Sequence, residues 1–252
     1  MAKVIAVANQ KGGVGKTTTA VNLSAALTLA GKRVLLVDFD PQGNATTGMG
    51  VAKTTRPNNY DMMIGKIPPE KCVVHTKFGD VLPSSKELAA ASVELIGTEK
   101  REYVLKTALM KLYADYDYIF IDCPPSLELL TVNALAAADS VLIPMQCEYY
   151  ALEGIADLLS SIKLSKKRLN KRLEVEGIVL TMYDARANLT AQVAAELRKY
   201  LSDKVYDTVV PRSVRLSEAP SHGIPGITYD RFNKGSRAYV ELAEEFIKKA
   251  ER

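Results

Sequence analysis

A glycine-rich segment lies close to the N-terminus, between a short apolar run and a helical pattern. The apolar run covers positions 3–9, the segment reads QKGGVGKT over positions 10–17, and the helical pattern covers 17–30 and is closed by Gly31. Glycines let the backbone curl so that successive N–H groups point at one phosphate, and the following helix N-terminus adds its positive dipole end. This strand–loop–helix order predicts a phosphate-binding loop and therefore a nucleotide-binding α/β fold.

The residues of this loop have distinct expected roles. Lys16 supplies a positive charge to the β- and γ-phosphates, and the Thr17 hydroxyl coordinates Mg²⁺. An ordinary glycine turn is the alternative, and the full strand–loop–helix context argues against it. The residues expected to bind the nucleotide are Lys11, Gly12, Gly13, Val14, Gly15, Lys16, Thr17 and Thr18.

The loop departs from the usual G-x-x-x-x-G-K-[ST] pattern at two positions. Gln10 stands where the first glycine is expected, and Lys11 precedes Lys16 by five positions. A second lysine at this spacing is similar to the deviant Walker A class, in which it reaches across a dimer interface to the partner's nucleotide. The alternative is a solvated turn residue. We expect Lys11 to act in catalysis together with Lys16.

Apolar runs alternate with helical patterns along most of the chain. Strand–helix alternation with fully apolar strands predicts a parallel sheet with helices on both faces. The expected fold is α/β, a single-domain P-loop NTPase over 1–252 with a mostly parallel twisted sheet. Residues 54–92 are rich in turn residues, and we expect variable surface there around one short strand. The expected strands are 3–9, 33–38, 118–122, 140–146, 176–182 and 205–210, and the expected helices are 17–30, 99–113, 127–137, 152–169, 187–200 and 237–249.

Two expected strands end in aspartate. Asp38 ends one and leads into a loop that contains Asp40, and Asp122 ends another. Ligands of open parallel sheets bind beyond the carboxyl ends of the strands, so these carboxylates should lie beside the phosphate loop. Asp122 fits the Walker B position near Mg²⁺, Asp38 is a further expected metal ligand, and Asp40 is expected to orient the attacking water. The alternative is that they only form turns or caps.

The apolar runs, the cysteine spacing and the net charge bear on which other classes of protein the chain could belong to. No apolar run approaches the ~20 residues of a membrane-spanning helix, and the N-terminus lacks a signal-peptide pattern. We therefore expect a cytoplasmic protein. The three cysteines are widely spaced without a CxxC pair, which favours neither a disulfide framework nor a metal site. The net charge of +4 permits an anionic partner without requiring one.

Five segments together resemble the ParA/Soj family of partition ATPases. The similarity covers nearly the whole chain and is weakest over 54–92. The first two segments are shared with MinD and nitrogenase reductase relatives, whereas the last two are more specific to the chromosomal Soj type. The helix-turn-helix extension of some plasmid relatives is not expected, because residue 3 already opens the first strand. The segments are 9–19 (NQKGGVGKTTT), 37–46 (VDFDPQGNAT), 121–127 (IDCPPSL), 144–154 (PMQCEYYALEG) and 211–223 (PRSVRLSEAPSHG).

The resemblance implies an ATP-dependent switch rather than a metabolic enzyme. ATP and Mg²⁺ would close two subunits into a homodimer, each Lys11 contacting the phosphates held by the other. The dimer would bind double-stranded DNA without sequence preference, in association with the nucleoid. A ParB/Spo0J-type centromere-binding protein would stimulate the slow hydrolysis that returns the dimer to monomers. The adenine pocket of relatives maps to 181–182 and 211–214, which gives Met182, Pro211, Ser213 and Val214 as expected contacts.

The same resemblance assigns DNA contacts to Arg186 and Arg215, which lie on loops after expected strands. Without the family resemblance, both residues would be interpreted as solvated arginines. A denser basic run, KLSKKRLNKR over 163–172, holds six Lys or Arg residues. Because cations are favoured at helix C-termini, a solvated helix end is the preferred interpretation of this run, and an added DNA surface is the alternative.

Three other classes compete with this interpretation. A MinD-like membrane-associated positioning ATPase would need a basic amphipathic C-terminal helix, yet 239–252 carries Glu241, Glu244 and Glu245 in its first turns. We expect its apolar stripe to pack into the core. A nitrogenase-reductase-like electron carrier would need cluster cysteines, and Cys123 is placed for core packing. A small-molecule enzyme of the dethiobiotin-synthetase type would need a substrate pocket, for which the sequence gives no signal.

Overall fold

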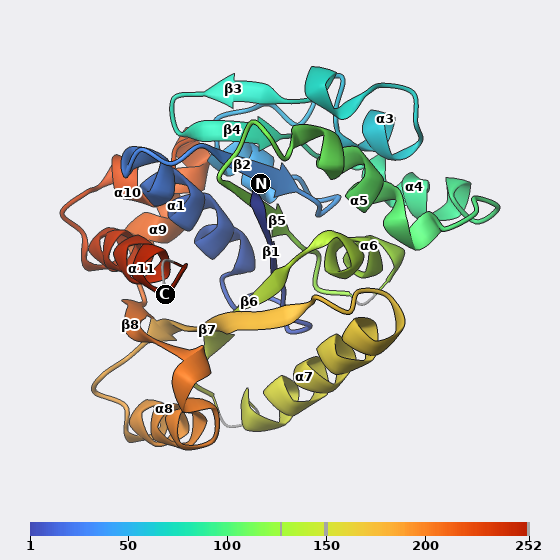
Figure 1. The fold of residues 1–252 in the computed structure, drawn as a ribbon. Helices are drawn as coiled ribbons and strands as arrows, with labels where there is room; N and C mark the ends of the chain where they lie inside the picture. The colour runs from blue at the N-terminus through green and yellow to red at the C-terminus, as the bar shows by residue number, and fades with distance from the viewer. Residues whose placement is uncertain (127, 149–150, 251–252) are drawn as a thin grey trace.

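One eight-stranded sheet organises the chain, in the strand order β3-β4-β2-β5-β1-β6-β7-β8 (Figure 1). The computed structural model describes residues 1–126, 128–148 and 151–250. All neighbouring strands pair in parallel except β3 and β4, which confirms the predicted mostly parallel α/β sheet. The strands are β1 Lys3–Val7, β2 Val34–Asp38, β3 Val74–Thr76, β4 Gly79–Leu82, β5 Tyr118–Asp122, β6 Ser140–Gln146, β7 Glu174–Tyr183 and β8 Val205–Pro211.

Helices cover both faces of the sheet (Figure 1). Successive side chains of a strand point to opposite faces, and in β1 Val4 and Ala6 join one core cluster while Ile5 and Val7 join the other. The first cluster lies under α3 to α8 and the second under α1, α2 and α9 to α11. The helices are α1 Lys16–Leu29, α2 Asn44–Gly48, α3 Asn59–Met63, α4 Leu88–Glu94, α5 Val104–Leu109, α6 Leu129–Ala137, α7 Ala151–Arg168, α8 Asn188–Leu201, α9 Val214–Glu218, α10 Gly226–Tyr229 and α11 Lys234–Ala250.

The C-terminal helix α11 is part of the core. Tyr239, Leu242 and Phe246 are fully or almost fully buried, and the Phe246 ring lies 5.3 Å from that of Tyr118 and 5.7 Å from that of Phe120. The Tyr239 hydroxyl also lies 3.0 Å from that of Thr19, which ties α11 to the helix that follows the phosphate loop. The expected core packing of this stripe is confirmed. Within the described part of the chain, no helix is long and apolar enough to cross a membrane.

The expectation for residues 54–92 was wrong in two respects. The region contains two strands rather than one, because β4 extends the sheet beside β2 and β3 folds back on β4 in antiparallel register. Much of the region is also buried rather than surface, including Met63, Leu82 and Leu88. Strands of three and four residues are too short to give a periodic pattern, so the turn residues dominated the sequence signal.

The single helix expected over 99–113 was also wrong. The segment divides into the 3₁₀ turn η2 Arg101–Tyr103, the helix α5 and the 3₁₀ turn η3 Met110–Leu112. The Asn133 side chain of α6 accepts a hydrogen bond from Leu105 N at 3.1 Å and donates to Arg101 O at 2.9 Å. These bonds occupy backbone groups at the junction of η2 and α5. A tertiary contact thus replaces part of the local helical pattern.

The remaining short elements are 3₁₀ turns and connections. The turns η1 Pro69–Lys71, η4 Ser202–Lys204 and η5 Ala219–His222 join longer elements. The expected helices at 152–169, 187–200 and 237–249 are found as α7, α8 and α11 with small shifts at their ends. Leu127, the expected first residue of another helix, lies outside the described residues, as do Tyr149 and Tyr150 of the fourth family segment and residues 251–252 of the expected tail.

Burial of α11 predicts that Phe246→Ala lowers the free energy of unfolding by about 3–5 kcal/mol, since a buried aromatic ring leaves a cavity when it is removed. Urea unfolding followed by circular dichroism measures the change. Lys248→Ala on the exposed face of the same helix is the control and should be nearly neutral. Equal stability of the Phe246 variant and the wild type would contradict the core assignment.

Candidate nucleotide-binding site

The glycine-rich segment forms a curled loop between β1 and α1. Gly13 and Gly15 have φ angles of +75° and +90°, in the left-handed region that glycine adopts without steric cost. Lys16 then begins α1, and Thr19 N donates to Gly15 O at 2.8 Å. The backbone thus adopts the conformation for which its glycines were predicted, directly at the N-terminus of a helix.

Side chains from neighbouring strands hold this loop in place. Thr181 Oγ1 in β7 donates to Val14 O at 2.7 Å, and Asn9 Nδ2 donates to Pro144 O in β6 at 2.9 Å. Asn9 Oδ1 accepts from Lys11 N at 3.0 Å. Gln146 Nε2 makes a longer contact of 3.5 Å with Gly13 O. The loop is therefore held by groups of β6 and β7, the two strands that follow β1 in the strand order of the sheet.

The two lysines of the loop differ in their surroundings. Lys16 is buried beneath the loop, and its Nζ donates to Lys11 O at 3.1 Å. Burial lowers the pKa of Lys16, and the negative charge of Asp122 opposes that shift. Lys11 is half exposed, and its Nζ forms an ion pair with Glu148, which follows β6. Lys16 is thus held inside the site, whereas Lys11 is held at its surface.

Asp122 is the best candidate for a carboxylate near a metal. It ends β5, directly opposite Asp38 in the register of β2 and β5. Both of its oxygens are buried, and neither accepts a hydrogen bond of good geometry from the described residues. Burial is the main cause that raises its pKa, Asp38 raises it further, and the nearby Thr17 hydroxyl opposes the shift. A buried carboxylate beside a threonine hydroxyl fits the oxygen ligands that Mg²⁺ prefers.

Magnesium would share this site with phosphates. In the described part of the chain, no group of three or more His, Cys, Asp and Glu side chains could hold a metal by itself. Mg²⁺ in nucleotide enzymes is commonly held by one or two carboxylates together with the phosphates of the substrate. Thr17 and Asp122 are the side chains placed to contribute from the protein.

Asp38 is engaged by its own chain. Its Oδ2 accepts from Thr46 N at 2.7 Å and from Thr46 Oγ1 at 2.6 Å, and the Thr46 hydroxyl accepts from Ser84 N at 2.8 Å. Burial raises the pKa of Asp38 to about 6, and the bonds from Thr46 oppose that shift. The Asn59 side chain donates to the backbone oxygen of Asp38. A direct metal contact by Asp38 would have to compete with Thr46.

Asp40 lies in the loop after β2 and is partly exposed. Its backbone N contacts Asp38 Oδ1 at 3.3 Å, and its own Oδ1 accepts from Gln42 N at 2.9 Å. The negative charge of Asp40, like that of Asp122, opposes the lowering of the Lys16 pKa by burial. A carboxylate held by a turn and electrostatically coupled to the phosphate-loop lysine is suitably placed for the expected role with water.

A small cavity lies beside the loop where the adenine was expected. It has a volume of about 100 Å³ and includes Gly15, Thr18, Met182, Pro211 and Ser213 in its lining. Met182 has a φ of 48°, which is unusual for a residue other than glycine and marks a strained position. Ser213 Oγ is occupied as the N-cap of α9, 3.3 Å from Leu216 N.

Val214, the fourth expected adenine contact, lies elsewhere. Its side chain is exposed and lines a neighbouring cavity of about 840 Å³ together with Arg186. Arg212, which the sequence analysis did not single out, lines both cavities. Its Nη2 lies 3.9 Å from the Met182 sulfur. Its place directly after β8, within the segment 211–214 mapped to the adenine pocket, was a signal that could have found it.

The two arginines expected to bind DNA are both paired with carboxylates. Arg186 makes two bonds of 3.0 Å to Asp184, and its guanidinium lowers the pKa of Asp184 to about 2. Arg215 Nη1 lies 3.0 Å from Glu218, and its Nε lies 3.6 Å from Asp230. Arg186 follows β7 and Arg215 lies on α9, so both lie beyond the carboxyl ends of strands.

Further side chains of the site were not assigned a role from the sequence. Glu148, Gln146 and Thr46 lie within the family segments, but no pattern indicated which atoms they contact. Asn59 and Ser84 come from residues 54–92, where the sequence predicted variable surface around one short strand. Only the pairing of β2 with β4 brings Ser84 next to Thr46, so a sequence signal for this contact does not exist.

Comparisons with known proteins find relatives among the Soj and ParA proteins. A family model described as an AAA domain matches residues 2–175. The chain is 55% identical over 248 residues to the sporulation initiation inhibitor protein Soj of Bacillus subtilis, covering 97% of this chain and 98% of Soj. It is 51% identical over 250 residues to the chromosome partitioning protein ParA of Caulobacter vibrioides, covering 97% and 94% of the two chains.

A solved structure shares the fold. Cobyrinic acid a,c-diamide synthase of Mycobacterium smegmatis, with bound ADP and magnesium, has a TM-score of 0.85 to this chain. The two are 37% identical, and the similarity covers 100% of this chain and 97% of that chain. A P-loop fold with a nucleotide and magnesium at its site is thus found in a protein that is similar in structure.

The burial of Asp122 predicts that Asp122→Asn stabilises the nucleotide-free protein at neutral pH, because burial raises the pKa of this carboxyl in the folded state. The raised pKa means that ionised Asp122 destabilises the fold above the unfolded pKa. The gain should therefore shrink as the pH falls toward about 4, where the unfolded carboxyl also becomes protonated.

Thermal unfolding with and without Mg-ATP measures both effects. The variant should lose most of the additional stabilisation that Mg²⁺ gives in the presence of ATP. Asp117→Asn, just before the same strand, is a control of opposite sign because Arg33 lowers the pKa of Asp117. A nucleotide-free Asp122 variant that is less stable than the wild type would contradict the assignment.

Proposed function

Because the chain belongs to the Soj/ParA family of chromosome-partitioning ATPases, we propose that it is an ATP-dependent switch in DNA partitioning. ATP binding closes two subunits into a homodimer that binds double-stranded DNA without sequence preference. Slow hydrolysis, stimulated by a ParB/Spo0J-type partner, returns the dimer to monomers. In this proposal the whole chain acts as one ATPase domain that associates with the nucleoid.

In this proposal, each part of nucleotide binding and hydrolysis is assigned to a few residues. Lys16 and the loop amides bind the phosphates, and Thr17 and Asp122 hold Mg²⁺, with Asp38 beside them. Met182, Pro211 and Ser213 contact the base at the small cavity. Asp40 positions water for attack on the γ-phosphate, which is a matter of orientation more than of charge. Magnesium, when bound, neutralises the charge that develops on the transferred phosphate.

The divergence of the two lysines is the observation that supports this proposal most. Lys16 is buried beside Asp122, whereas Lys11 is half exposed and paired with Glu148 at the surface. Exposed ion pairs of this kind contribute about 0–1 kcal/mol, so Glu148 is easily exchanged for another anion. The phosphates of a nucleotide bound to a second subunit are such an anion. Lys11 is therefore proposed to act across the dimer interface.

DNA binding follows from the same closure. Each subunit offers Arg186 and Arg215, and in the free chain both must first be released from carboxylates. Two such contacts bind a phosphate backbone weakly, while the four of a rigid dimer act together through effective concentration. ATP-driven dimerisation then makes DNA binding depend on the nucleotide, without new contacts within a subunit.

The rival functions are less well supported. A MinD-like membrane-associated ATPase would need an apolar helix face for lipid, yet Tyr239, Leu242 and Phe246 of α11 are buried against the sheet. The electron-carrier alternative would need exposed cluster ligands, and Cys72, Cys123 and Cys147 are buried. A small-molecule enzyme of the synthetase type is less well supported because the chain is 55% identical to Soj but 37% identical to cobyrinic acid a,c-diamide synthase.

The proposed role of Lys11 predicts that Lys11→Ala still binds ATP but remains monomeric, because its cation serves the partner's site. Calorimetry measures ATP binding, and size exclusion with ATP and Mg²⁺ measures dimerisation. Lys86→Ala removes another exposed lysine and should dimerise normally. Normal dimerisation of the Lys11 variant would show that the lysine does not act between subunits.

The proposed DNA surface predicts that Arg215→Glu loses DNA binding while ATP-driven dimerisation persists. A gel shift on random-sequence duplex should be run beside size exclusion of the same sample. For the wild type, log affinity should fall by about 0.9 per log unit of salt for each phosphate neutralised. Lys86→Glu makes the same charge change at another exposed position. Retained DNA affinity would place the surface elsewhere, and loss of the dimer would place Arg215 in the subunit interface.

A further inference from the structure

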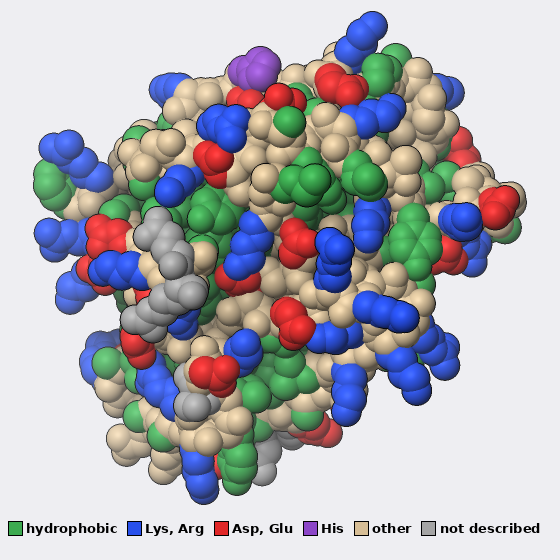
Figure 2. All heavy atoms as spheres, in the orientation of Figure 1, with side chains coloured by type: hydrophobic (Ala, Val, Ile, Leu, Met, Phe, Trp, Pro, Cys, Tyr) green, Lys and Arg blue, Asp and Glu red, His purple; other side chains and the backbone are tan. Residues whose placement is uncertain are grey.

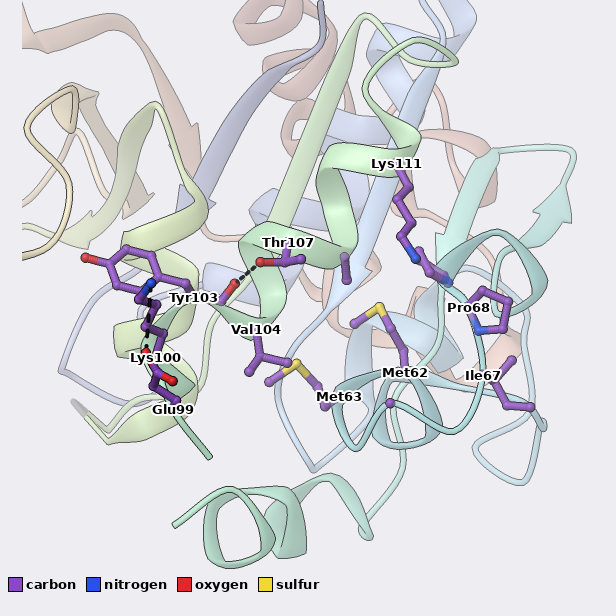
Figure 3. A pocket seen from close by; sticks show the side chains of 13 residues that line it. Met62, Met63, Ile67, Pro68, Glu99, Lys100, Tyr103, Val104, Thr107 and Lys111 are labelled. Carbon is purple, nitrogen blue, oxygen red and sulfur yellow. Dashed lines mark hydrogen bonds and ion pairs between the residues drawn. The ribbon is translucent and has the colours of Figure 1, made fainter. Parts of the chain in front are cut away.

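A groove that the nucleotide site does not use lies between α3 and α5 (Figure 3). It has a volume of about 560 Å³, and its floor includes Met62, Met63, Ile67 and Val104. Figure 3 shows the two methionines below α5, with Val104 pointing toward Met63. Methionine-rich surfaces adapt to varied apolar side chains, so this floor is suited to an inserted apolar residue.

The rim of the groove is basic. Lys100 and Lys111 lie at its edge, and Tyr103 also lines it. Figure 3 shows Lys111 extending toward Pro68 on the opposite side. Glu99 is the acidic residue that the lining contains, and it lies 4.0 Å from Lys100 Nζ. An apolar floor with lysines at its border is therefore open to an amphipathic ligand.

The basic rim continues onto the end of α7. The Tyr103 hydroxyl donates to Leu169 O at 3.0 Å, which joins the groove to the run 163–172. Figure 2 shows Lys and Arg side chains gathered over the carboxyl-terminal half of α7. We call the groove and this run together the α5–α7 surface. Within the described part of the chain, no ion pair within 4.0 Å engages Lys167, Arg168, Lys171 or Arg172.

The charge of this surface is out of proportion to that of the chain. The groove lining and residues 163–172 together hold eight Lys or Arg and one Glu, a formal charge of +7, whereas the whole chain has +4. The rest of the chain is therefore net negative. The C-terminal dipole of α7 favours a few cations in its last turn, but it does not account for those on 99–111.

We propose that the α5–α7 surface binds an acidic amphipathic segment of a partner protein. Apolar side chains of a helix or extended segment enter the groove, and its carboxylates face Lys100, Lys111 and the basic run. A nucleic-acid backbone would use the charges but leave the apolar groove empty, so the groove favours a protein partner.

The location keeps this surface apart from the nucleotide site. The basic run precedes β7 and Arg186 follows it, so the two lie at opposite ends of one strand. None of the residues that line the groove is a candidate nucleotide, metal or DNA contact. The inference therefore goes beyond the proposed function and does not depend on it.

The test uses synthetic peptides as probes on the full chain, followed by fluorescence anisotropy at physiological salt. The first peptide has leucines at helical spacing with glutamates between them, the second has lysines in place of the glutamates, and the third has the glutamates but glutamines in place of the leucines. The first should bind, and the other two should bind roughly tenfold more weakly or not at all, because each lacks one half of the complementarity.

Matched variants locate the binding. Thr107→Glu and Lys111→Glu, both at exposed positions that line the groove, should weaken the first peptide roughly tenfold. Lys106→Glu makes the same charge change on α5 without lining the groove and should change the affinity less than about threefold. Circular dichroism and thermal unfolding of each variant exclude misfolding.

Several results would overturn the proposal. Equal binding of the second peptide would remove the role of charge, and equal binding of the third would remove the role of the groove. Equal weakening by Lys106→Glu and Lys111→Glu would indicate a diffuse charge effect. A random-sequence duplex that displaces the first peptide, and that binds more weakly to Lys171→Glu, would make the surface a nucleic-acid site instead.

Discussion

The nucleotide site depends on the balance between one buried lysine and the carboxylates that surround it. Lys16 lies below the loop, and Asp38, Asp40 and Asp122 lie at the ends of β2 and β5 nearby. The register of the two strands fixes Asp38 opposite Asp122, so neither can move away from the other. Adding a triphosphate makes the site more negative still. Such a site needs further positive charge, and Mg²⁺ and a second lysine would supply it.

The same electrostatic logic connects the free chain to the proposed switch. The cations proposed to bind a partner's nucleotide or DNA are each paired with a surface carboxylate, Lys11 with Glu148, Arg186 with Asp184 and Arg215 with Glu218. Exposed pairs of this kind are weak and exchange their anion readily. Phosphates of a nucleotide or of DNA can therefore replace the carboxylates once a second subunit brings them together.

The sequence carried much of this structure but not all of it. The phosphate loop, the central strands and the strand-end aspartates could be predicted because glycines, apolar runs and terminal carboxylates are local signals. Residues 54–92 could not, since β3 and β4 are too short to show periodicity and are stabilised by pairing with β2. The breaks around α5 depend on Asn133, a distant residue. The hold of Thr46 on Asp38, and the groove beside Met63, likewise arise only from the folded arrangement.

The most direct test of the account is whether Lys11 acts on the nucleotide of the other subunit. Lys11→Ala and Asp40→Ala are each expected to hydrolyse ATP poorly alone, the first for lack of a dimer and the second for lack of water positioning. In a mixed dimer, the Lys11→Ala subunit keeps its own Asp40 and receives Lys11 from its partner, which completes one site. The ATPase rate of an equimolar mixture with DNA should therefore rise well above that of either variant alone, since each mixed dimer has one complete site out of two. A mixture as inactive as its two components would contradict action between subunits.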